Sequence, residues 1–124
     1  MEECSKPDSK YFLRARFGHA ETIIPLAALL EVPDLSDQSV PANETYTYET
    51  NNWRGELVSP MAANIQWDIF RCITSDSHHA PILIRMLYNE YPVKFKTACQ
   101  PYDYQYPFFY TINELKRCYN MSEL

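Results

Sequence analysis

Glycine is scarce in this chain, with two residues among 124, whereas proline occurs nine times and tyrosine ten times. A compact fold with many tight turns normally uses more glycine, because positive φ angles are costly for other residues. The shortage therefore argues against a fold rich in glycine turns. It indicates long loops that contain proline, or a chain taken out of a larger domain.

The sequence also lacks long apolar runs and an excess of positive charge. No run of about 18 apolar residues occurs, so we expect no membrane span. Residues 1–10 have no apolar core of a cleaved signal peptide. With 11 basic and 16 acidic residues, the net charge is -5, which argues against a nucleic-acid partner. This charge would also repel a polyanionic substrate unless a local positive pocket outweighed it.

The four cysteines lack metal-site spacing, and we expect neither a metal nor another cofactor. Their even number is compatible with disulfides. Cys99 and Cys118 flank an aromatic segment that contains proline. A bridge between them would close about 19 residues and stabilise the fold by roughly 3 kcal/mol. All three pairings of four cysteines remain possible on the sequence alone.

Two glycosylation sequons point to the secretory pathway, with the endoplasmic-reticulum lumen or the cell exterior as the expected location. They begin at Asn43 and Asn120. Such features without a signal peptide contradict each other. The simplest resolution is that the front of the protein is missing from this chain.

The pattern of apolar residues predicts a strand followed by a helix in the first third of the chain. Residues 11–17 alternate as a strand does. Residues 22–32 are apolar nearly all round, which predicts a helix that is buried on most sides. We expect Thr22 to cap this helix, Pro25 to lie in its first turn and Pro33 to end it.

The rest of the chain predicts an exposed loop, a hairpin and a short terminal helix. The polar loop covers residues 33–54, and we assign it no catalytic role. Alternating residues predict two strands that form a hairpin over 64–88. The other expected segments are an extended stretch at 56–59, a turn at 74–81, a loop at 89–99, an aromatic run at 101–109 and a helix at 114–119 capped by Thr111 or Asn113.

The stretch from Arg14 to Thr22 is the part of the sequence that points to chemistry. It places His19 and Glu21 at the mouth of the predicted helix, where free amides and the helix dipole favour an anion. A histidine there can donate a hydrogen bond to a phosphoryl oxygen, and a glutamic acid can protonate a leaving oxygen. From these residues alone, a helix cap with a surface charge is the commoner explanation.

The run RFGHAET followed by IIPLAALL resembles the segment around the His-Ala-Glu motif of multiple inositol polyphosphate phosphatases. That family is a branch of the histidine acid phosphatases, most of which carry His-Asp at this point. Downstream, SPMAANIQWDIFRC (59–72) and ILIRMLYNEYPV (82–93) are similar to two strands of the family in order and spacing. The terminal MSEL is similar to an endoplasmic-reticulum retention signal. The resemblance spans about residues 11–124, and its specific part is the His-Ala-Glu stretch.

The resemblance implies an α/β fold, namely the C-terminal portion of the three-layer α/β sandwich of a histidine phosphatase, with an incomplete sheet. Residues 1–124 would then be one fragment of that domain. Its parts would be a strand and buried helix with the motif (11–32), a strand hairpin (55–95) and an aromatic tail with two cysteines (96–124). The remainder of the phosphatase domain would be absent from the chain.

The resemblance also implies roles for the motif. His19 would contact the transferring phosphoryl group, and Glu21 would act as general acid towards an inositol polyphosphate or another phosphomonoester. The family forms a phosphohistidine on an Arg-His-Gly-x-Arg motif, which does not occur here. His78 and His79 are expected to be exposed loop residues. We therefore expect the isolated chain to be inactive.

Two alternatives remain at this point. The chain could be a non-catalytic secreted module for binding or structure that has lost the nucleophile. Alternatively, the likeness could be accidental, and the chain could be a small secreted domain held by disulfides. An upstream Arg-His-Gly-x-Arg motif in the same reading frame would decide for the phosphatase.

Overall fold

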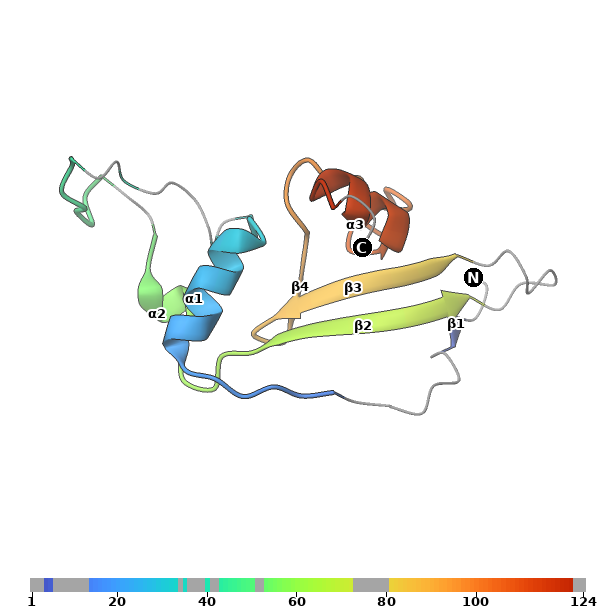
Figure 1. Ribbon diagram of the computed structural model, residues 1–124, viewed down its shortest axis with the longest axis horizontal. Coiled ribbons are helices and arrows are strands. Elements are labelled where there is room, and N and C mark those ends of the chain that lie inside the picture. Colours follow the sequence, from blue (N-terminus) through green and yellow to red (C-terminus); the bar gives the residue numbers. More distant parts are fainter. Residues whose placement is uncertain are drawn as a thin grey trace.

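A computed structural model describes residues 4–5, 14–33, 35, 40, 43–50, 53–72 and 81–121. These residues form one antiparallel sheet with helices against it (Figure 1). The elements in chain order are β1 (Cys4–Ser5), α1 (Ala20–Leu29), α2 (Gly55–Val58), β2 (Ile65–Cys72), β3 (Ile82–Tyr88), β4 (Tyr91–Val93), β5 (Tyr110–Thr111) and α3 (Ile112–Cys118). No helix in this described part is long and apolar enough to cross a membrane.

The predicted hairpin is the centre of the sheet. β2 and β3 run antiparallel, with Ile65 opposite Tyr88 and Arg71 opposite Ile82. Both strands are inner strands of the sheet, because β1 pairs with the other edge of β2, and β4 and β5 pair with the other edge of β3. The prediction of two strands between 64 and 88 is therefore confirmed. Of the turn expected at 74–81, only Pro81 lies within the described residues.

The loop predicted at 89–99 contains a strand that the sequence did not indicate. Asn89 and Glu90 have φ angles of 48° and 71°, which is the φ pattern of a type I′ turn. This two-residue turn pairs Tyr88 with Tyr91 and starts β4. Pro92 concealed the strand in the sequence, because proline is found in strands mainly at sheet edges. β4 lies at such an edge.

The helices pack on the sheet face that carries Met86 and Tyr88. One buried cluster joins the sheet, the tail and the end of the α1 segment, and it consists of Val32, Met86, Phe95, Cys99, Tyr110 and Cys118. A second cluster joins α1, α2 and β3 through Ala27, Val58 and Tyr88. The Tyr88 hydroxyl donates to the Val58 carbonyl at 2.6 Å, which fixes α2 to β3. Coverage is incomplete, since Trp67 and Ile69 of β2 remain 45% and 47% exposed.

The prediction of a strand at 11–17 is wrong for its described part. Residues 14–19 have no regular secondary structure, and Figure 1 shows them as a plain tube that leads into α1. Within the described residues, no strand pairs with this stretch. A strand without a neighbour leaves its backbone groups without ladder partners, so the alternating pattern alone does not form one.

The helix predicted at 22–32 exists, but its limits and its burial were wrong. α1 begins at Ala20 and has His19 as its N-cap, so Thr22 lies inside the first turn. Pro25 is therefore the sixth helical residue and lies beyond the first turn. The helix ends at Leu29, before Pro33. Within α1 only Ala27 is fully buried, and Leu29 is 76% exposed, so the helix is not covered on most sides in this chain.

The remaining elements give one error and one confirmation. The segment expected to be extended at 56–59 is the short helix α2. The terminal helix is confirmed as α3, and it begins two residues earlier than predicted. Of the two proposed caps, Thr111 is correct, because its side chain accepts a hydrogen bond from the Glu114 amide at 3.2 Å.

Candidate functional site

His19 and Glu21 both lie at the N-terminal end of α1, which we call its mouth. His19 is the N-cap residue in an extended conformation, and its carbonyl accepts hydrogen bonds from the amides of Thr22 at 2.9 Å and Ile23 at 3.4 Å. Its side chain makes no capping hydrogen bond. Glu21 lies in the first turn, and both side chains are exposed. The imidazole and the carboxyl are thus presented beside the helix N-terminus.

Gly18 allows the backbone before α1 to pass close to the Thr22 side chain in the first turn. A Cβ atom at this position would lie 2.9 Å from Oγ1 and 3.2 Å from Cβ of Thr22. Thr22 therefore packs its side chain back against Gly18 instead of capping the helix. A larger residue at position 18 would push the entry of the chain away from the first turn. The glycine thereby helps to set the direction from which His19 reaches the helix.

This arrangement can serve phosphoryl chemistry in two ways. The first-turn amides of a helix have no helical partners and can face an anion. A carboxyl two residues beyond the histidine can reach an oxygen next to that anion and transfer a proton. Among the residues that the structure describes, no group of three or more His, Cys, Asp or Glu side chains could hold a metal ion.

The opposite end of α1 is held by a well-formed helix stop. Glu31 has a φ of 49°, its amide donates to Ala28 at 3.0 Å, and the Val32 amide donates to Ala27 at 3.2 Å. These two bonds define a Schellman motif. Ala27 and Val32 are both fully buried, Ala27 in the cluster with α2 and β3 and Val32 in the cluster with the tail. The C-terminal end of α1 is therefore anchored, whereas its N-terminal end is exposed.

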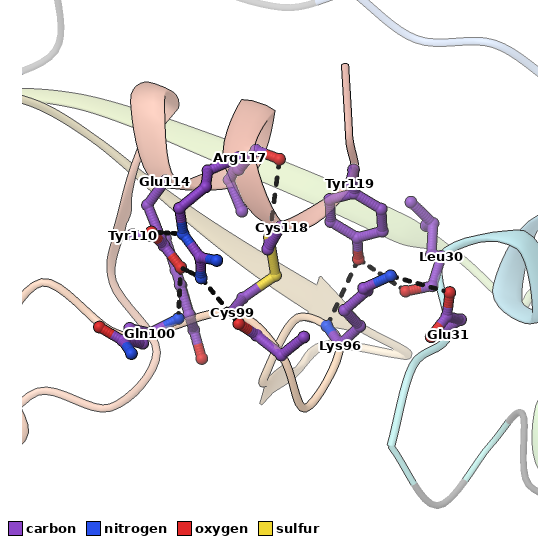
Figure 2. The surroundings of a disulfide bond; sticks show 12 residues. Leu30, Glu31, Lys96, Cys99, Gln100, Tyr110, Glu114, Arg117, Cys118 and Tyr119 are labelled. Atoms are coloured by element: carbon purple, nitrogen blue, oxygen red, sulfur yellow. Dashed lines mark hydrogen bonds and ion pairs between the residues drawn. A yellow bond between two sulfur atoms is a disulfide. The ribbon is translucent and has the colours of Figure 1, made fainter. Parts of the chain in front are cut away.

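Side chains of the tail also bind this end of the helix, through a hydrogen bond and an ion pair. The Tyr119 hydroxyl donates to the Leu30 carbonyl at 2.6 Å, and the Lys96 ammonium pairs with Glu31 at 3.0 Å (Figure 2). Burial raises the pKa of Tyr119, whereas the hydrogen bond from the Lys96 amide acts in the opposite direction. Tyr119 consequently stays protonated and able to donate.

The disulfide predicted between Cys99 and Cys118 is present and secures the tail. Beside it, Arg117 forms two hydrogen bonds to the Glu114 carboxylate, of 2.6 and 2.8 Å, and one to the Ala98 carbonyl at 2.9 Å (Figure 2). The Arg117 hydrogen bonds are the main cause that lowers the pKa of Glu114 to about 2. The bridge, the Arg117 bond to Ala98 and the bond from the Gln100 amide to the Glu114 carboxylate together tie α3 to the segment before the aromatic run.

The remaining predicted residues lie apart from the helix mouth. Asn43 and Asn120 are exposed, and Asn120 has a φ of 52° just after α3. His78 and His79 lie outside the described residues. Tyr119 was not singled out from the sequence. No local signal could have found it, because its contact with Leu30 joins residues 89 positions apart.

Comparisons with known proteins agree with the resemblance in the sequence. No family model matches the chain. The chain is 37% identical over 91 residues to multiple inositol polyphosphate phosphatase 1 of Dictyostelium discoideum. The aligned residues make up 73% of this chain and 14% of that protein.

Solved structures of a bacterial enzyme match more of the chain. The multiple inositol polyphosphate phosphatase of Bifidobacterium longum in complex with inositol hexasulfate is 46% identical, with a TM-score of 0.72 over 84% of this chain. Its complex with phosphate gives 43% identity and a TM-score of 0.74 over 86% of the chain. In both cases the match spans 21% of the bacterial chain. The mixed helix and antiparallel sheet thus corresponds to part of the histidine phosphatase α/β fold.

Proposed function

Since the chain is a homologue of multiple inositol polyphosphate phosphatases over 14–21% of their length, we propose that it supplies the acid-donor part of such an enzyme. The proposed reaction is the hydrolysis of phosphomonoesters, inositol polyphosphates in particular, through a phosphohistidine intermediate. Glu21 protonates the leaving oxygen and then takes a proton from the attacking water. His19 donates a hydrogen bond to the transferring phosphoryl group.

The observation that carries the proposal is the pairing of His19 and Glu21 at the mouth of α1. An inositol alkoxide is a poor leaving group, so cleavage of its phosphate ester requires a proton donor beside the bridging oxygen. The exposed Glu21 carboxyl beside the helix N-terminus suits this task. The structures of the B. longum enzyme with inositol hexasulfate and with phosphate support an inositol phosphate as the substrate class.

The proposed intermediate requires a nucleophile from outside this segment. The three histidines of the chain are His19, His78 and His79, and none stands in an Arg-His-Gly-x-Arg sequence. A phosphohistidine needs an imidazole held in line with the phosphorus atom. The chain is therefore proposed to contribute the proton donor to a site whose nucleophile lies in another segment.

We also propose that the chain passes through the secretory pathway, either to the endoplasmic-reticulum lumen or out of the cell. The Cys99–Cys118 disulfide supports an oxidising compartment. Asn43 and Asn120, which begin the two sequons, are both exposed. Loss of mass on glycosidase treatment of the chain secreted from eukaryotic cells, absent after Asn43→Gln and Asn120→Gln together, would support this location. An unglycosylated product would count against it.

The function can be tested in a chimera, defined as the B. longum phosphatase with its matching segment replaced by the corresponding residues of this chain. Glu21→Gln in the chimera should lower hydrolysis of inositol hexakisphosphate by about 10² to 10⁴-fold. The loss should be much smaller for p-nitrophenyl phosphate, whose leaving group needs little protonation. Steady-state kinetics on both substrates measure the two losses.

Glu56→Gln is the matched control, because Glu56 is also an exposed acidic residue in the first turn of a helix. It should change neither rate. Equal losses on both substrates after Glu21→Gln would contradict the proposed role and leave Glu21 as a charge at the helix mouth.

A further inference from the structure

We propose that Tyr119 is a positioning residue for the acid donor, which it serves by fixing the far end of the helix that carries Glu21. This inference rests on the proposed function of Glu21. Tyr119 does not reach the helix mouth. It acts at the Leu30 carbonyl, one residue beyond the end of α1.

The bond from Tyr119 meets a structural need of the helix. The last carbonyls of a helix have no helical donors and require partners from elsewhere. The Schellman bonds supply donors for Ala27 and Ala28, and the Tyr119 hydroxyl supplies one for Leu30 at 2.6 Å. The end of α1 is thus tied to the tail at a defined distance and direction.

Tyr119 is itself held in place, so it can serve as a fixed point. It follows Cys118, which is bonded to Cys99. Its ring packs edge-on against the buried Phe95, with ring centres 6.4 Å apart. Its oxygen also accepts a hydrogen bond from the Lys96 amide at 3.4 Å. Figure 2 shows the hydroxyl pointing toward Leu30 and Lys96, on the same side as Glu31.

Because the helix is rigid, fixing its C-terminal end also restricts the position of its N-terminal end. A helix of ten residues is about 15 Å long, so a tilt of about 4° at one end moves the other by about 1 Å. Along α1 itself only Ala27 is fully buried, Ile23 and Ile24 are partly buried against the second cluster, and the residues at its mouth are exposed. The contacts at the C-terminal end therefore weigh heavily in setting the place of Glu21. A misplacement of 1 Å is enough to slow an enzyme strongly.

Tyr119→Phe tests the inference, because it removes the hydroxyl and keeps the ring against Phe95. In the chimera it should lower kcat for inositol hexakisphosphate by about 3- to 30-fold and leave KM nearly unchanged. It should lower kcat for p-nitrophenyl phosphate much less, since that ester does not depend on the acid. Tyr102→Phe, which alters an exposed tyrosine of the same tail, should change neither.

The two substrates separate positioning from a structural effect. A loss of folded protein would reduce both rates by the same factor, and this result would overturn the inference. Tyr119→Phe could leave the ratio of the two rates, on inositol hexakisphosphate and on p-nitrophenyl phosphate, unchanged. If Glu21→Gln still lowered the first rate much more than the second, this result would overturn the positioning role alone. If Glu21→Gln itself were unselective, the proposed function would fail first.

Hydrogen exchange gives a measurement that does not depend on activity. In the chimera with Tyr119→Phe, amide hydrogens should exchange faster in the second half of α1 and at Glu31 and Val32. The amide hydrogens of β3 should keep their exchange rates. Uniformly faster exchange in both elements would indicate general destabilisation and contradict the inference. Unchanged exchange in α1 would also contradict it.

Discussion

At the scale of single residues, the chain places other amino acids where glycine is usual. Among the described residues, five non-glycine positions have positive φ angles: Glu31, Ala62, Asn89, Glu90 and Asn120. Such a conformation costs roughly 1–2 kcal/mol for a residue with a Cβ atom. Glu31 and Asn120 each follow the end of a helix, and Asn89 with Glu90 forms the turn between two strands. Backbone bonds around these sites offset the cost.

His19 allows a clean test at this scale, because its side chain does not cap the helix. His19→Ala should therefore leave the melting temperature of the chimera almost unchanged. If His19 contacts the phosphoryl group, the substitution should weaken transition-state stabilisation by about 2–4 kcal/mol, or roughly 30- to 900-fold in kcat/KM. Steady-state kinetics and thermal unfolding provide the two measurements. Unchanged kinetics would show that His19 serves only through its backbone.

At the scale of elements, the Glu114–Arg117 pair of α3 makes a prediction about acid stability. The folded state lowers the pKa of Glu114 from 4.5 to about 2. The protonated carboxyl is therefore disfavoured in the folded state, so the stabilisation is present above pH 4.5 and is lost as the pH falls toward 2. Glu114→Gln should destabilise the chimera at neutral pH and flatten this loss.

Urea unfolding at several pH values between 2 and 6 would measure the difference. Glu49→Gln, which alters an exposed carboxyl in the loop, is the control and should keep the pH dependence of the parent protein. The same slope in both variants would show that the ion pair contributes nothing to acid stability.

The elements differ in how far the sequence could predict them. β2 alternates between apolar and polar residues over most of its length, β3 is apolar or aromatic at every position except Arg85, and their ladder is completed inside the chain. The stretch 14–17 shows the same alternation, but it has no neighbouring strand in the described part. The start of α1 was placed two residues late, because Thr22 is a good cap by type, whereas its side chain packs on Gly18. Alternation therefore predicts a strand correctly only where a neighbouring strand is present to pair with it. Likewise, the type of a residue predicts a cap only where its side chain has no other packing partner.

The candidate site was predictable to a similar degree. His19 and Glu21 belong to one short motif, so local sequence was enough to propose them. Cys99 and Cys118 flank one segment, which suggested their disulfide but left the other pairings open. The hydrogen bond from Tyr119 to the Leu30 carbonyl forms only when the tail folds against the end of α1. No property of the tyrosine itself distinguishes it from the nine others in the chain.

At the scale of the whole molecule, the chain leaves much apolar surface uncovered. Phe17 is 98% exposed and Leu29 76%, and Trp67 and Ile69 lie half exposed on β2. Each large apolar side chain that is not buried forgoes about 1.5–3 kcal/mol, against a typical total stability of about 5–15 kcal/mol. The Cys99–Cys118 bridge offsets part of this deficit, but it covers neither β2 nor the mouth of α1.

We therefore expect the purified chain to bind a hydrophobic dye and to associate in solution. Dye fluorescence and size-exclusion chromatography would measure this, with the chimera as the comparison that offers covering surfaces. A monomer that unfolds in one sharp thermal transition would contradict the expectation and show that the chain is stable by itself.

We propose that the chain supplies a proton donor but not a nucleophile. The most direct measurement compares phosphate release from inositol hexakisphosphate by the purified chain and by the chimera at equal concentrations. We expect release at background level by the chain and clear turnover by the chimera, whose remaining segment supplies the nucleophile. Turnover by the purified chain well above background would contradict the proposal, because none of its histidines stands in the required motif.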